Sequence, residues 1–236
     1  MGREPDPIKL LLGERTPFEL DAKTTALLIV DLNVNDAHPE GAVARLARRR
    51  GIFDLFVPYY ERIRREVTPN VRKLLTAARQ AGVTVIYLTT CAPVPGSSAQ
   101  VQGEAERGVP LALPGRRDAE ILAEIVPQRG DIVVTKHTSG AFNSSALDRV
   151  LRNLGIEVLV IAGVATHRCV ELTARDAADR GYGIILVADA CADFTTELHQ
   201  DALNRMDDGA MTEITTTAEL LQRLLQRAEM EDEGTS

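Results

Sequence analysis

The sequence has little of what most cofactor and metal sites require. It contains no tryptophan, five phenylalanines, four tyrosines and three cysteines in 236 residues. An odd cysteine count without a C-x-x-C pair or a zinc-type Cys/His spacing indicates neither a disulfide framework nor a structural metal site. The four histidines form no H-x-x-x-H or H-E-x-x-H arrangement, and no G-x-G-x-x-G or G-x-x-x-x-G-K-[ST] loop is present. We therefore expect no metal ion and no bound cofactor.

The sequence also lacks long apolar runs and a basic face. No segment approaches the roughly 20 apolar residues that span a bilayer, and the first residues lack the apolar core of a signal peptide. The formal net charge is −7, whereas phosphate binding requires clustered Lys and Arg. We expect a soluble, cytoplasmic protein that binds neither membranes nor nucleic acid.

Short runs rich in Val and Ile alternate with segments of helical periodicity. The predicted strands are 26–31, 83–89, 131–136, 157–163, 183–189 and 211–215, and the predicted helices are 68–82, 117–127, 144–155, 167–181, 197–209 and 217–228. Near-continuous apolar strands suit a sheet buried on both faces. The pattern predicts a three-layer α/β/α fold in one domain over 1–228, with an N-terminal extension at 1–20 and a disordered acidic tail at 229–236.

Two predicted connections are too long to be simple turns. Residues 32–67 hold four of the nine aromatic residues, and residues 91–114 are rich in Pro, Gly and Ser. Long loops in a compact domain are usually lids, binding walls or interfaces, although plain surface excursions also occur. We expect the aromatic segment 52–60 to be buried, either over a site or against another subunit.

Three reactive residue types follow predicted strands. Asp31 ends the first strand, Lys136 ends the third, and Cys169 lies in the first turn of the helix after the fourth. Ligands of open parallel sheets bind at the carboxyl ends of the strands, so these side chains can converge there. A lysine and a helix N-terminus both favour the thiolate, which is the nucleophilic form. The sequence predicts an acid, a base and a reactive thiol at one site.

Each of these residues also has a structural interpretation. Asp31 can cap a loop, Lys136 can be a solvated strand end, and Cys169 can fill the core. Cys91 and Cys191 also follow strands, but neither begins a helix and so neither gains the helix dipole. The basic run 45–51 is either a solvated helix face or a site for a carboxylate or a neighbouring subunit.

From about residue 24 to residue 220, the chain resembles the isochorismatase-like cysteine hydrolase superfamily. The resemblance is carried by three segments that occur in the expected order: TALLIVDLNVND, VTVIYLTT and GVATHRCVELTARDA. The resemblance implies a six-stranded, mostly parallel Rossmann-like sheet, a homodimer or homotetramer, and a catalytic triad at Cys169, Asp31 and Lys136. It also implies an oxyanion hole formed by the amides of Ala165 and Cys169, with a cis peptide between Val164 and Ala165.

The resemblance further implies a reaction. Members with this cysteine are metal-independent amidohydrolases that form a thioester, and the segments around 126–134 and 139–171 look most like the ureidoacrylate and biuret type. The position of the nicotinamidase metal motif reads TTCAPVPG, which disfavours that branch. The expected partner is a small amide or ureido substrate. Two alternatives remain open: a vinyl-ether hydrolase of the isochorismatase type, and a catalytically silent binding module.

The predicted substrate-binding residues are Asp36, His38, Phe142, Thr166 and His167. Asp36 and His167 depart from the family pattern, in which an aromatic residue and an asparagine are usual. An inward-pointing Asp36 would disfavour a substrate carboxylate and favour a cationic or N–H-rich group. Phe142 and the aromatic segment are expected to supply the missing wall.

Overall fold

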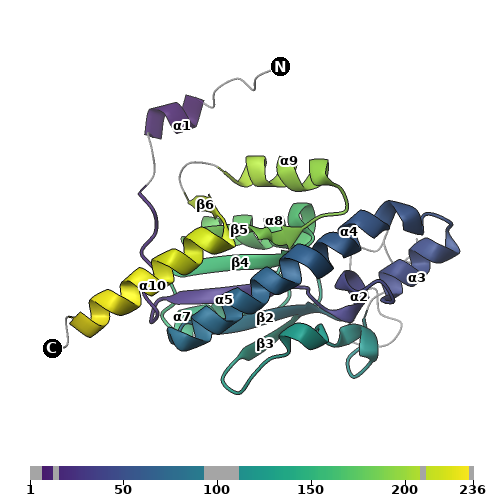
Figure 1. Ribbon diagram of the computed structural model, residues 1–236, viewed down its shortest axis with the longest axis horizontal. Helices are drawn as coiled ribbons and strands as arrows, with labels where there is room; N and C mark the ends of the chain where they lie inside the picture. Colours follow the sequence, from purple (N-terminus) through teal and green to yellow (C-terminus); the bar gives the residue numbers. More distant parts are fainter. Residues whose placement is uncertain (1–6, 13–15, 93–111, 208–210, 234–236) are drawn as a thin grey trace.

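The computed structural model describes residues 7–12, 16–92, 112–207 and 211–233 (Figure 1). Six parallel strands form one sheet in the order β3-β2-β1-β4-β5-β6. The strands are β1 (Thr25–Val30), β2 (Thr84–Thr90), β3 (Ile132–Lys136), β4 (Val158–Val164), β5 (Gly183–Ala192) and β6 (Thr212–Thr215). The predicted strands and the parallel sheet are confirmed.

Helices cover both faces of the sheet, as a three-layer fold requires. Helices α5 (Thr68–Gln80) and α10 (Thr217–Glu233) pack on one face with Leu27 and Ile29 of β1. Helices α7 (Leu147–Asn153), α8 (Glu171–Asp179) and α9 (Thr196–Met206) pack on the other with Leu28 and Val30. Alternate residues of one strand thus enter two separate cores. No helix in the described ranges is long and apolar enough to cross a membrane.

The helix predicted at 117–127 is wrong. The chain there makes two single turns, η3 (Arg117–Ala119) and η4 (Ala123–Ile125), joined by extended backbone. Ile121 pairs antiparallel with Asn33, the Val34 N–H donates to the Glu120 carbonyl, and the Leu122 N–H donates to the Leu32 carbonyl. These bonds to the segment after β1 replace the bonds that a helix would make within itself.

The connection between β1 and α5, predicted as a long loop, is mostly helical. It contains α2 (Val34–Ala37), α3 (Ala42–Arg49), η1 (Phe53–Phe56), α4 (Val57–Arg62) and a wider turn, η2 (Ile63–Val67), that runs directly into α5. Most of the second predicted loop, 93–111, lies outside the described residues.

The two ends of the chain differ from the middle. Helix α1 (Pro7–Leu12), within the predicted N-terminal extension, lies away from the sheet in Figure 1. Helix α10 continues to Glu233, five residues beyond the predicted end at 228, and residues 234–236 of the predicted acidic tail lie outside the described residues.

Candidate active site

The candidate site lies where the strand order reverses, between β1 and β4. Crevices for ligands form at such points, beyond the carboxyl ends of the strands. Asp31 follows β1 directly and is the one non-glycine among the described residues with positive φ, at 50°. Gly163 of β4 pairs with Val30 at φ 130°, and a Cβ there would lie 2.1 Å from the Val30 carbonyl oxygen. The close approach of the two strands therefore requires glycine at 163.

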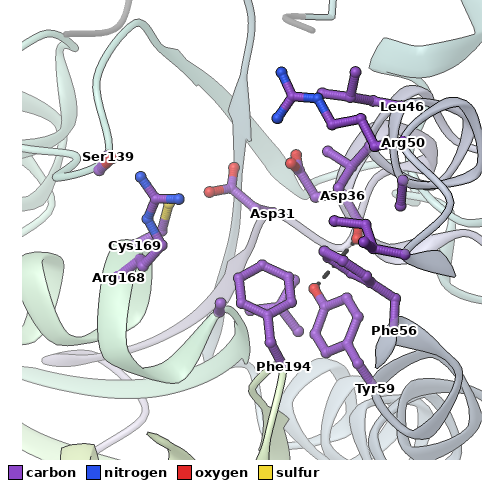
Figure 2. A pocket seen from close by; sticks show the side chains of 15 residues that line it. Asp31, Asp36, Leu46, Arg50, Phe56, Tyr59, Ser139, Arg168, Cys169 and Phe194 are labelled. Carbon is purple, nitrogen blue, oxygen red and sulfur yellow. Dashed lines mark hydrogen bonds between the residues drawn. The ribbon is translucent and has the colours of Figure 1, made fainter. Parts of the chain in front are cut away.

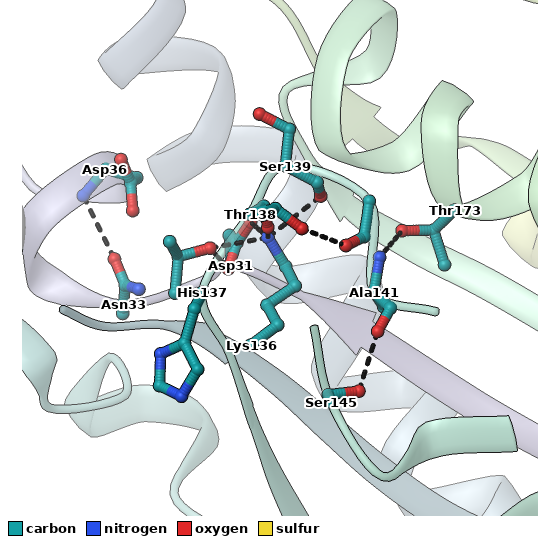
Figure 3. A network of polar contacts seen from close by, with 12 residues as sticks. Asp31, Asn33, Asp36, Lys136, His137, Thr138, Ser139, Ala141, Ser145 and Thr173 are labelled. Carbon is teal, nitrogen blue, oxygen red and sulfur yellow. Dashed lines mark hydrogen bonds and ion pairs between the residues drawn. The ribbon is translucent and has the colours of Figure 1, made fainter. Parts of the chain in front are cut away.

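A buried ion pair joins Asp31 to Lys136 across β2. The Lys136 Nζ lies 2.8 Å from Asp31 Oδ2, and the Thr90 hydroxyl donates to Asp31 Oδ1 at 2.9 Å. The ammonium also donates to the Thr90 hydroxyl and to the carbonyl oxygens of Thr138 (3.1 Å) and Ser139 (3.0 Å). Figure 3 shows this network, from which the His137 ring points away. Lys136 is therefore not the solvated strand end that the sequence also allowed.

The charge of Asp31 determines the state of Lys136. Burial by itself lowers the pKa of this lysine, but Asp31 and, after it, Cys169 and Asp36 together more than offset that effect, and the pKa is raised above its ordinary value. Lys136 has no accessible surface. The site thus holds a fixed positive charge beneath the carboxylate.

Cys169 lies in a single wide turn, η5 (Thr166–Val170), that leads from β4 into α8. Cys169 and Asp31 both line one cavity, and Asp31 affects the proton of the thiol. Burial, and then the negative charge of Asp31, raise the pKa of the thiol well above its ordinary value, and Lys136 reverses only part of this shift. The raised pKa favours the neutral thiol over the predicted thiolate, with Asp31 beside it to take the proton.

A cavity of about 240 Å³ opens over these groups. Figure 2 shows Asp31 between Cys169 and Asp36, with Phe56, Tyr59 and Phe194 along one wall. The polar lining side chains are Asp31, Asp36, Arg50, Ser139, Arg168 and Cys169, and the apolar ones include Val43, Leu46, Ala47, Ile52, Phe56 and Phe194. Of the two positions expected for the aromatic segment, over a site or against another subunit, Phe56 and Tyr59 take the first. Leu55 and Val57 are exposed, so the segment is only partly buried.

Asp36 places a second carboxyl group in the same cavity. Burial and then the charge of Asp31 raise its pKa to about 7, while Lys136 acts in the opposite direction. The Asn35 side-chain amide donates to Asp36 Oδ1 at 3.0 Å, and the Asp36 N–H donates to Asn33 Oδ1. Asp36, predicted to bind substrate, thus lines the cavity.

The predicted oxyanion residues also border the cavity. Ala165 and Cys169 both line it, and the peptide bond between Val164 and Ala165 is cis, as the resemblance implied. Thr166 and His167, which follow, are not among the lining residues. The turn and its N-cap therefore present Ala165, Arg168 and Cys169 to the cavity, whereas Thr166 is buried.

Thr166 and His167 each form hydrogen bonds on the side away from the cavity, Thr166 with His199 and His167 with Asp193. Arg62 donates to His199 Nε2 at 3.2 Å, so the histidine must carry its proton on Nδ1, which donates to the Thr166 hydroxyl at 2.8 Å. Burial and Arg62 lower the pKa of His199 to about 4, so it is neutral. The prediction that Thr166 binds substrate is not supported, because its hydroxyl is buried against α9.

Asp193 holds His167 in place. Its carboxylate accepts from the His167 N–H at 2.6 Å and from the His167 ring at 2.7 Å. The ring lies edge-on to Phe194, with centroids 6.1 Å apart. His167 therefore supports the wall of the cavity through Phe194 instead of lining it, contrary to the prediction.

Two further predicted substrate residues lie elsewhere. His38 accepts from the Glu40 N–H and lines a second hollow of about 440 Å³, together with Arg48 and Tyr60. Phe142 is buried in the core on the other face of the sheet, 6.0 Å from Tyr182 between ring centroids. Neither lines the cavity that contains Cys169.

The sequence did not single out Thr90, Ser139, Arg168 or Phe194. The positions of Thr90 and Ser139 could have identified them as site residues, because they lie at or just beyond the carboxyl ends of β2 and β3. Arg50 was noticed only within a basic run. Cys91 and Cys191 are buried and do not line the cavity. Within the described residues, no group of three or more His, Cys, Asp or Glu side chains could hold a metal ion.

Comparison with known proteins agrees with this fold. The isochorismatase domain model matches residues 25–219. A secreted isochorismatase effector of Verticillium dahliae is 34% identical over 125 residues, covering 53% of this chain and 59% of that protein. A ureidoacrylate amidohydrolase of Stutzerimonas stutzeri is 33% identical over 201 residues, covering 79% of this chain and 77% of that protein.

Solved structures share the architecture. A cysteine hydrolase from Pseudomonas syringae pv. phaseolicola superposes with a TM-score of 0.73 at 25% identity, covering 90% of this chain and 97% of that chain. The N-carbamoylsarcosine amidase of Thermoplasma acidophilum superposes with a TM-score of 0.63 at 26% identity, covering 82% of this chain and 96% of that chain.

Proposed function

Because this chain belongs to the isochorismatase family, we propose that it is a cysteine amidohydrolase that cleaves the C–N bond of a small amide or ureido compound. The observation that carries the proposal is that Cys169 and Asp31, the latter paired to Lys136, both line one cavity, where Asp31 acts on the thiol proton. The names of the ureidoacrylate and N-carbamoylsarcosine enzymes both specify a carbamoylated nitrogen, which favours a ureido substrate.

The first step is attack by sulfur. The thiol is protonated at neutral pH, so Asp31 takes its proton as the sulfur bonds to the carbonyl carbon. Lys136 offers no free hydrogen to the substrate, because its donors are engaged with Asp31, Thr90 and the carbonyls at 138 and 139. Its role is to hold Asp31 in position and to balance its charge.

The carbonyl oxygen becomes negative as the tetrahedral intermediate forms. The N–H groups of Ala165 and Cys169 stabilise it, since both residues border the cavity and backbone amides are suitable oxyanion donors. When the C–N bond breaks, Asp31 returns its proton to the departing nitrogen, which leaves as ammonia or an amine. The acyl group remains on Cys169 as a thioester.

Water completes the cycle. Asp31 accepts a proton from the water molecule that attacks the thioester carbonyl, and the proton passes to the sulfur as the C–S bond breaks. The product is a carboxylic acid, or a carbamate if the substrate is a ureido compound. The cavity, of about 240 Å³, suits a compound smaller than the drug-sized ligands that fill pockets of about 300–1,000 Å³.

The test is ammonia release from a panel of ureido acids, biuret, simple carboxamides and nicotinamide. The wild type is measured beside Cys169→Ala and the control Cys91→Ala, which removes a buried thiol outside the cavity. We expect turnover of at least one ureido or amide compound, its loss in Cys169→Ala and its retention in Cys91→Ala.

Two outcomes contradict the proposal. Turnover that survives in Cys169→Ala excludes the thioester, and retained cleavage of a vinyl ether by that variant supports isochorismatase chemistry. An absence of turnover across the whole panel supports a silent binding module.

A further inference from the structure

The cavity contains a carboxyl group that the proposed reaction does not use. Asp36 is five residues from Asp31, in the first turn of α2, and its carboxyl group points into the same space (Figure 2). Its position is fixed at the backbone, since the Asp36 N–H donates to the side chain of Asn33, the N-cap of α2. Asp36 is therefore a fixed part of the cavity wall and not a mobile surface group.

The local charges leave Asp36 available to a ligand. Lys136 has three hydrogens, and its four oxygen partners are Asp31, Thr90, Thr138 and Ser139. The amide of Asn35 donates one hydrogen bond to Asp36 Oδ1. A carboxylate has about four acceptor positions, so most of the accepting capacity of Asp36 faces the cavity.

Many of the other side chains that line the cavity are apolar. Val43, Leu46, Ala47, Ile52, Phe56 and Phe194 are apolar and surround the space beside Asp36. Inside such a wall a carboxylate attracts N–H donors and strongly repels a second negative charge. Asp31 on the cavity floor adds a second negative charge, which Lys136 balances. Arg50 and Arg168 also line the cavity, and each already has an interaction partner.

We propose that Asp36 determines substrate specificity: it accepts hydrogen bonds from an N–H-bearing substituent next to the scissile carbonyl and excludes compounds that carry a carboxylate at that position. The substrate class is thus a urea or amide in which the substituent next to the scissile carbonyl ends in an amide, urea or amidine group. This inference rests on the proposed amidohydrolase function and narrows it, because it sets this chain apart from enzymes that act on small ureido acids.

The test uses two compounds that differ by one group, N-carbamoylglycinamide and N-carbamoylglycine. Burial and Asp31 raise the pKa of Asp36 to about 7, so the comparison is made at about pH 8, where this carboxyl group is ionised. Values of kcat/KM are measured for the wild type, for Asp36→Asn, which keeps the shape and removes the charge, and for Asp36→Ser. The control is Asp54→Asn, an exposed carboxylate in the neighbouring η1 turn that does not line the cavity.

We expect the wild type and Asp54→Asn to favour the amide over the acid by about tenfold or more, as a like charge in a desolvated site requires. Both Asp36 variants should lose most of this preference, mainly because they accept the acid better. A wild type that favours the acid, or a preference that persists in both variants, overturns the inference.

A binding measurement separates this inference from the proposed function. The same two compounds are titrated calorimetrically into Cys169→Ala, alone and combined with Asp36→Asn. A binding preference for the amide that disappears with Asp36→Asn supports the inference even if the wild type hydrolyses neither compound, a result that would count against the proposed reaction alone. If neither compound binds, the inference is wrong.

Discussion

Lys136 shows how much of the site depends on one buried charge. Its side chain has no accessible surface, and it connects Asp31 and Thr90 to the carbonyls of Thr138 and Ser139. Removing one partner of a buried pair leaves the other charged and uncompensated, which is far more costly than losing an exposed pair.

We predict that Lys136→Met lowers the free energy of unfolding by about 3 to 5 kcal/mol. Asp31 would remain buried without its counter-charge, and two carbonyls would lose a donor. The exposed Lys23→Met is the control and should stay within about 0.5 kcal/mol of the wild type. Urea denaturation measures the free energy of unfolding of both variants. Equal stabilities of the two variants would contradict the claim that the buried pair of Asp31 and Lys136 stabilises the fold.

Asp36 is the residue whose protonation the fold changes most clearly within the working pH range. Its pKa in the folded protein is raised from 3.8 to about 7, so the native state binds this proton more tightly than the unfolded chain. The stability that results is complete below the unfolded pKa and is lost as the pH rises through about 7.

We therefore predict that the wild type loses stability relative to Asp36→Asn between about pH 5 and about pH 8, by on the order of 2 kcal/mol. Comparing the two proteins cancels the titration of the groups that do not interact with Asp36. Urea denaturation across this range tests the prediction, and parallel curves for the two proteins would show that the pKa of Asp36 is not raised.

At the scale of elements, the junction of β1 and β4 positions the site. The strands approach so closely at Val30 and Gly163 that a side chain at 163 would collide with backbone. Asp31 follows immediately on one strand, and the turn with Ala165 and Cys169 follows on the other. The geometry of the cavity therefore depends on this contact.

Gly163→Ala should lower the free energy of unfolding by about 3 kcal/mol or more, because it adds both a collision and an unfavourable φ. Gly155→Ala is the matched control, since Gly155 also has positive φ but open space around it, and should cost about 1 to 2 kcal/mol. Similar losses for the two variants, measured by thermal or urea unfolding, would remove the close approach as the reason for glycine at 163.

The elements also show which sequence patterns were informative. All six strands were predictable, because near-continuous Val and Ile runs meet the demand of a sheet buried on both faces. The segment 117–127 has helical periodicity, but bonds from residues 120–122 to residues 32–34 outweigh it. Such competition depends on segments more than 80 residues apart and is invisible in a local window.

At the scale of the whole molecule, the cavity is assembled from distant segments. Asp31 and Asp36 follow β1, Leu46 and Phe56 come from the segment before α5, and Cys169 follows β4. The convergence of Asp31, Lys136 and Cys169 was predictable, because carboxyl ends of parallel strands meet at one edge. The protonated state of the thiol was not, since the burial that raises its pKa arises only when these segments close over it.

The predicted substrate-binding residues also show what could not be predicted from the sequence. Asp36 was identified as a departure from the family pattern, and its side chain lines the cavity. His167 was chosen for the same reason, and Phe142 as a replacement for the missing aromatic wall. The side chains of the other predicted substrate residues do not line the cavity, and these residues instead contact Glu40 (His38), Tyr182 (Phe142), His199 (Thr166) and Asp193 (His167). Side-chain direction depends on tertiary partners that the sequence does not identify.

The central claim is that Cys169 carries the acyl group during turnover. The most direct measurement mixes the wild type rapidly with a compound that it hydrolyses, quenches in acid and determines the mass of the protein and of its Cys169 peptide. We expect the mass of one acyl group on Cys169 and none on Cys91 or Cys191. Turnover without any adduct, together with undiminished turnover by Cys169→Ala, would contradict the account.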